Sequence, residues 1–214
     1  MKILLIGANG QIGTHLVDQL QNSDKHTVKA MVRKEEQVEE LKQSGVEAVL
    51  GDLEGSVDGL VKVAKGCEAV IFTAGSGGHT GPDKTMIIDL DGAIKSMEAA
   101  EQTGAKRFVM VSAIHRNKRK YWSDKLVHYS AAKHYADRFL QASNLNHTIL
   151  RPGGLLNEPG TGKIKAGNYV ERDTIPREDV AQTAIAALDE ESTYKRAFDL
   201  VTGKTGIREA LKNI

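Results

Sequence analysis

The sequence predicts an α/β protein of three layers, in which helices cover both faces of a doubly wound parallel sheet. Short apolar runs alternate with stretches of helical periodicity along the whole chain of 214 residues. The first run, Ile3–Ile6, leads directly into a glycine-rich turn and an amphipathic helix. Strands that alternate with helices form βαβ units, so we expect parallel pairing and right-handed crossovers.

The first part of the chain supplies four of the predicted strands. Their continuous apolar character indicates burial on both faces. In chain order we expect a strand at Ile3–Ile6, a helix over Ile12–Leu20, a strand at Thr27–Val32, a helix at Glu35–Gln43, a strand at Val46–Leu50, a helix at Val57–Ala64 and a strand at Glu68–Phe72.

The rest of the chain continues this alternation with longer helices. We expect a glycine-rich loop at Ala74–Gly81, a helix at Pro82–Thr103 ended by Gly104, a strand at Arg107–Val111, a basic loop at His115–Lys120, a helix at Asp124–Ser143, a strand at His147–Leu150, a loop at Gly153–Gly167, a helix at Arg177–Leu188, a strand at Ala197–Val201 and a helix at Ile207–Leu211. No linker divides the chain. We therefore predict one domain over 1–214, with a cofactor-binding core at 1–150 and a small substrate-side and closing segment at 151–214.

Composition excludes several classes of protein. A formal net charge of +1 creates no strong field for nucleic acid or an anionic membrane. The single cysteine, Cys67, allows no internal disulfide and favours a reducing compartment. No apolar run is long enough for a membrane span or a signal segment. We therefore expect a cytoplasmic monomer or homodimer that acts on a small molecule, without membrane or nucleic-acid partners.

The turn after the first strand has the spacing of a dinucleotide site. Gly7 permits a tight turn, Gly10 allows the backbone to approach a pyrophosphate, and Gly13 lets the helix pack against the strand. The helix that follows presents free N–H groups and its positive dipole end to phosphates. A tight turn without a ligand is the alternative. We assign binding of a nicotinamide dinucleotide to Gly7, Asn9, Gly10, Gln11, Ile12 and Gly13.

The second strand indicates which dinucleotide is preferred. It ends at Arg33 and Lys34, with no acidic residue to bind a ribose 2′-hydroxyl. A guanidinium can hold a 2′-phosphate through a bidentate fork, so we predict NADP(H) over NAD(H). The alternative is a solvated basic pair at a helix start.

Asp52 follows the third strand and can accept a hydrogen bond from the adenine amino group, with Leu53 over the ring, or Asp52 can cap the next turn. Ala74 and Gly75 end the fourth strand, at the expected switch point of the sheet.

These motifs resemble the short-chain dehydrogenase/reductase superfamily, and its atypical branch in particular, which implies an NAD(P)-binding Rossmann fold. The resemblance rests on the glycine turn, Asp52-Leu53, Ala74-Gly75, Val111-Ser112, Tyr129-Ser130-Ala131-Ala132-Lys133 and Arg151-Pro152-Gly153. It implies that Tyr129 exchanges a proton with the substrate, that Ser112 orients the substrate oxygen, and that Lys133 holds the nicotinamide ribose, with Pro152 near the nicotinamide.

One position departs from the family pattern. Asp89 occupies the place of the fourth catalytic residue, an asparagine in the family, and a carboxylate there changes the proton relay and the surroundings of Lys133. By spacing alone, the alternative for Tyr129 is a partly buried helix residue with Lys133 as a surface charge, and for Ser112 it is a polar strand-end residue. His115, His128 and His134 lack the spacing of metal ligands, so we predict no metal.

The resemblance implies an NADP(H)-dependent oxidoreductase that transfers hydride to a small carbonyl, quinone or flavin-like compound. Its compact size is similar to the flavin and biliverdin reductases of the atypical branch. A non-catalytic protein that senses NADP(H) is the alternative, and a nucleotide-sugar epimerase/dehydratase is the third. The segment 151–214 is too short for the substrate domain of extended family members. The basic loop either steers an anionic substrate or is a solvated surface.

Overall fold

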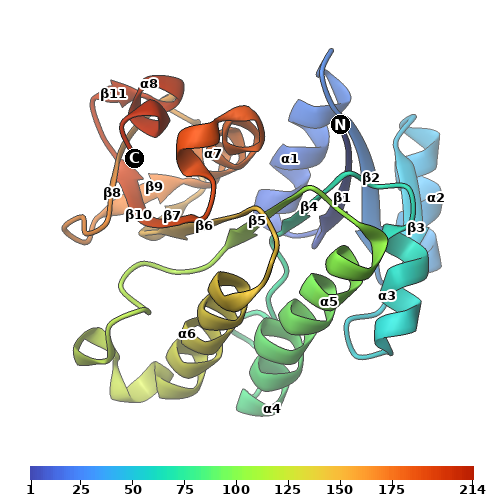
Figure 1. Ribbon diagram of the computed structural model, residues 1–214, viewed down its shortest axis with the longest axis horizontal. Coiled ribbons are helices and arrows are strands. Elements are labelled where there is room, and N and C mark those ends of the chain that lie inside the picture. The colour runs from blue at the N-terminus through green and yellow to red at the C-terminus, as the bar shows by residue number, and fades with distance from the viewer.

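The computed structural model describes residues 1–214 and places nine strands in one sheet. Their order is β11-β8-β10-β6-β5-β4-β1-β2-β3 (Figure 1). The strands are β1 Lys2–Ile6, β2 Thr27–Val32, β3 Glu47–Leu50, β4 Ala69–Phe72, β5 Arg107–Val111, β6 His147–Pro152, β8 Lys163–Gly167, β10 Arg196–Thr202 and β11 Thr205–Gly206. β1 lies between β2 and β4 and is parallel to both, so the strand order reverses here. Open α/β sheets bind ligands at such a point.

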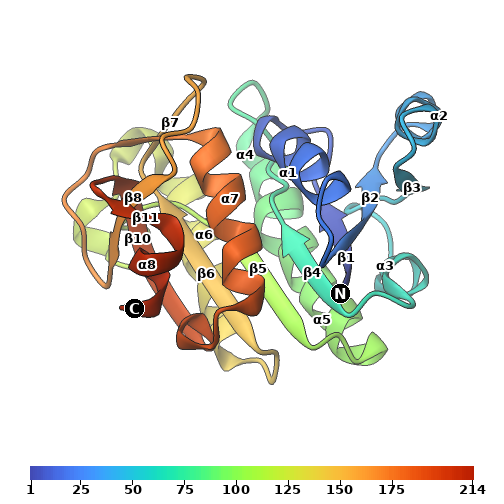
Figure 2. The same cartoon turned by 90° about the horizontal axis from the view of Figure 1, so that it is seen from above.

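Helices cover both faces of the sheet (Figures 1 and 2), because successive side chains of each strand point to opposite faces. In β1, Leu5 faces one cluster of 28 buried apolar residues and Ile6 the other, of 21. The first cluster includes α1 Gln11–Gln21, α2 Glu35–Gln43, α7 Arg177–Asp189 and α8 Ile207–Lys212. The second includes α3 Val57–Ala64, α5 Ala93–Thr103 and α6 Val127–Ala142. The predicted three-layer Rossmann fold is therefore confirmed.

The helix expected at Pro82–Thr103 changes its winding along its length. α4 (Pro82–Lys84) leads into a π-helical segment (Thr85–Gly92), which α5 continues. Gly104 ends α5 in the left-handed conformation, at a φ of +71°, as the sequence predicts. Winding of the π type is rare and is found frequently at functional sites. Asp89 lies within this segment and is buried.

The segment after β6 holds more strand than the sequence indicates. The expected loop Gly153–Gly167 contains β7 (Gly154–Leu156) and β8, and β7 pairs with β9 (Thr174–Pro176) in a separate small sheet. β8 runs antiparallel to β10 and β11, so the large sheet is not parallel throughout. These strands are short, and their pairing rather than their own apolar pattern defines them. The expectation of a loop here was wrong for that reason.

The basic loop between β5 and α6 is partly ordered by two short 3₁₀ turns, at Arg119–Tyr121 and Asp124–Leu126. α6 accordingly begins at Val127 rather than at the predicted Asp124.

No helix in the molecule has both the length and the apolar character needed to cross a membrane. No group of three or more His, Cys, Asp or Glu side chains is placed to hold a metal ion.

Candidate functional site

A cleft of about 800 Å³ opens at the carboxyl edge of the sheet. Its floor is made by the ends of β1, β2, β4 and β5, and its walls by the starts of α1 and α6, the glycine-rich loop after β4, and the start of α7. Crevices at this position of open α/β sheets are where ligands bind. This cleft is therefore the place where the predicted cofactor and catalytic residues should lie.

The first turn is built as a close backbone contact. Gly7 has a φ of +93°, and a Cβ placed there would lie 2.6 Å from the backbone nitrogen of Ala74. A Cβ on Gly13 would lie 2.1 Å from the carbonyl oxygen of Gly7, so only glycine fits under the turn. Gly10 begins α1 without any side-chain cap, which leaves the N–H groups of the first helical turn available. This bare, uncapped edge fits the pyrophosphate of a dinucleotide.

Most of the residues assigned to the cofactor line the cleft. They are Gly7, Asn9, Gly10, Gln11, Ile12, Arg33, Leu53, Ala74, Gly75 and Lys133. Arg33 is exposed at the end of β2, and no carboxylate pairs with it. Its guanidinium is therefore free to meet an anion at this end of the cleft.

Four residues assigned to the cofactor do not line the cleft. Gly13 lies behind the turn, where it permits packing. Lys34 directly precedes α2 as its N-cap residue. Asp52 accepts the N–H of Glu54 through Oδ1 at 2.8 Å, which is the capping alternative. Pro152 lies within β6, beside Leu200 of β10. The structure thus gives these four residues local structural contacts instead of a place on the cavity wall.

The four residues assigned to catalysis all line the cleft. Tyr129 and Lys133 share one face of α6, with Nζ of Lys133 lying 5.7 Å from the centre of the Tyr129 ring. Ser112 directly follows β5, and Asp89 comes from the π-helical segment opposite. Nζ of Lys133 forms an ion pair with Oδ1 of Asp89 at 3.0 Å. The fold therefore brings together groups that lie up to 44 positions apart in the sequence.

Asp89 links Lys133 to the glycine-rich loop. Its Oδ2 accepts the backbone N–H of Ser76 at 3.0 Å, while Oδ1 pairs with Lys133. Burial disfavours the ammonium of Lys133, but the charge of Asp89 and the neighbouring Tyr129 outweigh it and raise the pKa of the lysine above its ordinary value. Lys133 is therefore a permanent cation at neutral pH.

A second buried ion pair lies beneath Ser112. Nε of Arg151, on β6, donates to Oδ2 of Asp137, on α6, at 2.7 Å. Burial raises the pKa of Asp137, and the charges of Arg151 and Lys133 and the Ser112 hydroxyl oppose that rise. Oγ of Ser112 and Oδ1 of Asp137 nonetheless lack a hydrogen-bond partner of good geometry. The Ser112 hydroxyl therefore lies buried near the Asp137 carboxylate at the floor of the cleft, without a hydrogen bond of good geometry.

Several residues of the cleft wall were not predicted from the sequence. They are Ser76, Gly77, Gly78, Thr80 and Thr85 around the glycine-rich loop, and Leu126, His128, Leu155 and Arg177 elsewhere on the wall. The glycine run itself was a usable signal. Arg177 carried none, because it reaches the cleft only through the packing of α7 beside α1.

Comparisons with known proteins agree with this geometry. A family model described as NAD(P)H-binding matches residues 7–191. A Bacillus subtilis protein named "Uncharacterized sugar epimerase YhfK" is 57% identical over 214 residues, with all of both chains covered. A structure described as a putative NAD-dependent epimerase/dehydratase from Bacillus halodurans is 38% identical, with both chains fully covered and a TM-score of 0.93. The oxidoreductase ylbE from Lactococcus lactis is 32% identical with a TM-score of 0.89, and the match covers 100% of this chain and 96% of that one.

Reductases are among the more distant similar proteins. Sanguinarine reductase of Eschscholzia californica is 27% identical, over 100% of this chain and 93% of its own. The anaerobilin reductase ChuY of Escherichia coli shares the fold, with 22% identity, a TM-score of 0.81 and coverage of 95% and 98% of the two chains. A Veillonella parvula short-chain dehydrogenase/reductase in complex with NADP shares it as well, with 19% identity, a TM-score of 0.75 and 96% of each chain covered.

Proposed function

The chain belongs to the NAD(P)H-binding family of Rossmann-fold proteins, and on that premise we propose that it is an NADP(H)-dependent oxidoreductase acting on a small carbonyl, quinone or flavin-like compound. One observation carries the proposal. Tyr129, Lys133 and Ser112 line the same cleft as the uncapped glycine turn, so proton-transfer groups and a dinucleotide site share one cavity. The reductases among the related proteins support the same class of reaction.

The residues of the cleft divide the work of a carbonyl reduction between them. A bound nicotinamide supplies the hydride, which forms the new bond at the substrate carbon. The Tyr129 hydroxyl donates its proton to the substrate oxygen, and the Ser112 hydroxyl donates a hydrogen bond that orients this oxygen. Lys133 holds a ribose hydroxyl and provides a positive charge that stabilises the phenolate left behind. Water then returns a proton to Tyr129.

The preference for NADP(H) rests on Arg33. Its guanidinium lines the cleft, is exposed, and meets no carboxylate that would compete with a 2′-phosphate. Charge-assisted bidentate hydrogen bonds to phosphate are stronger than those between neutral groups. Replacement of the usual acidic residue at this strand end by a cation therefore selects the phosphorylated coenzyme.

Calorimetric titration with NADPH and NADH tests the coenzyme. We expect wild-type protein to bind NADPH about tenfold or more tightly than NADH, a difference of about 1.4 kcal/mol. Arg33→Ala is expected to weaken NADPH alone, whereas Lys25→Ala, an exposed cation away from the cleft, changes neither. Equal affinity of the wild type for the two coenzymes would refute the preference, and no heat with either would refute the site.

A screen of aldehydes, quinones and flavins with NADPH tests the reaction. We expect oxidation of NADPH with at least one class, and a loss of about a hundredfold or more in Tyr129→Phe, the size usual for removing a general acid. Binding without turnover would instead favour a protein that senses NADP(H). One observation supports that second function: Asp89 neutralises Lys133 directly, where the family has an uncharged asparagine.

A further inference from the structure

Arg116 is a buried cation without an anionic partner. Only 6% of the residue is exposed, yet no carboxylate forms an ion pair with it. Its Nη1 donates to Oγ of Ser130 at 3.0 Å, and its Nε is buried with no partner. Buried charges are normally paired, because removing an ion from water is costly unless an opposite charge compensates.

The other buried cations of the molecule either form an ion pair or, like Arg107, have a hydrogen-bond partner for every guanidinium nitrogen. Lys133 pairs with Asp89, Arg151 pairs with Asp137, and Arg107 donates to backbone carbonyls and hydroxyls. For Arg116, burial lowers the pKa, the neighbouring Tyr129 opposes this, and Arg172 adds to it. The positive charge of Arg116 is therefore the one that the folded chain leaves uncompensated near the reacting groups.

Arg116 lies beside the proposed proton donor. Its guanidinium carbon is 5.9 Å from the centre of the Tyr129 ring, nearly the same distance as Nζ of Lys133. The ion pair with Asp89 weakens the field of Lys133 at Tyr129, and Arg116 adds a second positive charge that has no such partner. Arg172 is exposed and close enough to repel Arg116, which extends this positive field toward solvent.

The basic loop widens the same positive region. Lys118 and Lys120 lie over the rings of Tyr169 and Tyr121, each at 4.9 Å, and Arg119 donates to Tyr135. None of these three cations forms an ion pair with a carboxylate. A cluster of unpaired cations next to a reactive group raises the local concentration of anions and steers them inward.

We infer that the substrate carries an anionic group, a carboxylate or a phosphate, that extends past Tyr129 to Arg116 and Arg172, which lie outside the lining of the cleft itself. This inference rests on the proposed function, since it names the substrate class of the same site. Its physical basis is that an anion supplies the compensation which Arg116 lacks, and that a guanidinium can hold either group through two parallel hydrogen bonds. The reacting carbonyl then lies at Tyr129 and Ser112, with the anionic group toward the basic loop.

Two matched pairs of compounds test the substrate class with NADP⁺-loaded protein in binding assays and with NADPH in rate assays. FMN and riboflavin differ in one phosphate, and 4-carboxybenzaldehyde and its methyl ester differ in one carboxylate charge. We expect at least one anionic member to bind, or to show a kcat/KM, about tenfold better than its neutral partner, which corresponds to about 1.4 kcal/mol. The flavin pair reports phosphate recognition, and the aldehyde pair reports carboxylate recognition.

Variants then assign the preference to residues. Arg116→Gln is expected to abolish the preference for the anionic member while leaving the Kd of NADPH unchanged. Arg172→Gln, at an exposed position that should fold normally, is expected to reduce the preference partly. Arg138→Gln, at an exposed arginine of α6, serves as the control and should keep the wild-type preference.

Several outcomes would overturn the inference. The inference is overturned if the wild type shows the same affinity and kcat/KM for both members of each pair. It is also overturned if none of the four compounds binds or reacts. An unchanged preference in both Arg116→Gln and Arg172→Gln would reject the two arginines. The coenzyme titration separates this failure from failure of the proposed function, because NADPH binding together with indifference to substrate charge overturns the anionic substrate alone.

Discussion

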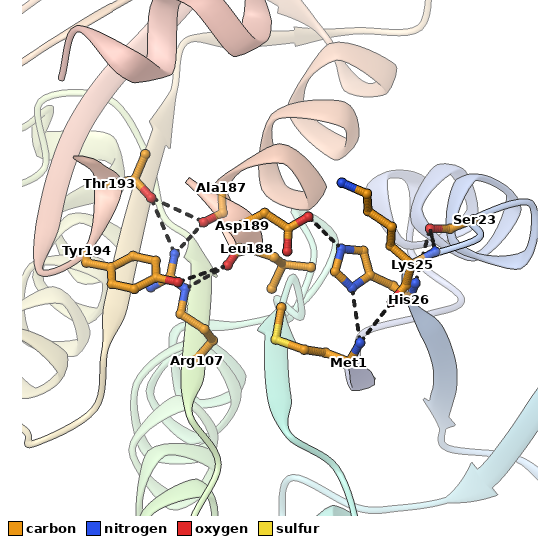
Figure 3. A network of polar contacts seen from close by, with 10 residues as sticks. All are labelled: Met1, Ser23, Lys25, His26, Arg107, Ala187, Leu188, Asp189, Thr193 and Tyr194. Carbon is orange, nitrogen blue, oxygen red and sulfur yellow. Dashed lines mark hydrogen bonds and ion pairs between the residues drawn. The ribbon is translucent and has the colours of Figure 1, made fainter. Parts of the chain in front are cut away.

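The two edges of the sheet treat buried charge in opposite ways. At the amino edge, the guanidinium of Arg107 donates to the carbonyl oxygens of Ala187 and Leu188 at the end of α7, at 2.6 and 3.4 Å (Figure 3). At the carboxyl edge, Oγ of Ser112 and Nε of Arg116 have no partner. The first edge satisfies the Arg107 guanidinium within the chain, whereas the second pairs Lys133 and Arg151 but leaves Oγ of Ser112 and Nε of Arg116 without a partner. This difference separates a region that stabilises the fold from one that is prepared for a ligand.

The amino edge ties distant parts of the chain together. Burial lowers the pKa of Arg107 to about 10, opposed by Tyr194 and Asp189, so the residue stays charged at neutral pH. The Tyr194 ring lies 4.1 Å from the guanidinium. Nε2 of His26, at the start of β2, lies 3.2 Å from Oδ2 of Asp189, at the end of α7 (Figure 3). These contacts join the two halves of the molecule at the edge opposite the cleft.

The largest expected effect tests the structural role of the amino edge. Arg107→Met removes the charged donor shared by the carbonyls of Asn146, Ala187 and Leu188, and a hydrogen bond to a charged group contributes about 1.5–3 kcal/mol. We expect the free energy of unfolding in urea to fall by about 3 kcal/mol or more. The Kd of NADPH, measured where the variant is folded, should not change. A loss of stability below about 1 kcal/mol would contradict the comparison.

Ser112→Ala tests the other edge. Because Oγ of Ser112 has no good hydrogen-bond partner, its removal should change the free energy of unfolding by less than about 1 kcal/mol. Turnover should nevertheless fall by about a hundredfold, since the substrate oxygen loses an orienting donor. Chemical denaturation and steady-state rates give the two measurements. A strongly destabilised variant, or one with full activity, would place Ser112 with the structural groups.

Arg177→Ala is expected to have a smaller effect, on coenzyme affinity. Arg177 lines the cleft with Gln11, because α7 packs beside α1 and both helices begin at this edge. We expect this cation to meet the pyrophosphate, which NADPH and NADH share and which the proposed site places at the start of α1. Both affinities should therefore fall by about tenfold, in contrast to Arg33→Ala. Arg208→Ala, at an exposed position of α8, is the control. A change in NADPH affinity alone would reject this placement.

The smallest expected effect is a pH dependence of stability from His147, near the amino edge. Burial lowers its pKa, opposed by a contact with the carbonyl of Leu145. The unfolded chain therefore takes up this proton at higher pH than the folded chain, so stability falls as the pH drops through about 6.5. His147→Gln should lose less stability than the wild type between pH 7.5 and 5.5 in urea denaturation. An identical pH dependence would exclude His147 as a contributor.

Local patterns were enough for much of the fold and part of the site. The spacing of Gly7, Gly10 and Gly13 predicts the turn, because the sharp reversal of the chain over these few residues requires residues without a Cβ. The spacing of Tyr129 and Lys133 places them on one helical face because an α-helix has a fixed period. These relations involve neighbours in the sequence, so the sequence alone contains them.

Other features depended on partners far along the chain. β8 is defined by its pairing with β10, and the antiparallel edge of the sheet could not be read from its own residues. The importance of Asp89 for the site follows from its contacts with Lys133 and Ser76. The contact with Lys133 forms only when the π-helical segment packs against α6. Asp52 lay between two interpretations until its contact with Glu54 favoured the cap.

By itself, the sequence determined the order of strands and helices, the glycine turn that accepts a dinucleotide, and the residue types available for proton transfer. Only the tertiary structure decided which charges are compensated. Arg107, Arg151 and Arg116 are the same residue type in the sequence, yet Arg107 donates to several carbonyls and hydroxyls, Arg151 forms an ion pair, and Arg116 leaves its Nε without a partner. The reason is physical: the cost of a buried charge depends on groups brought close by folding, and sequence distance does not report that proximity.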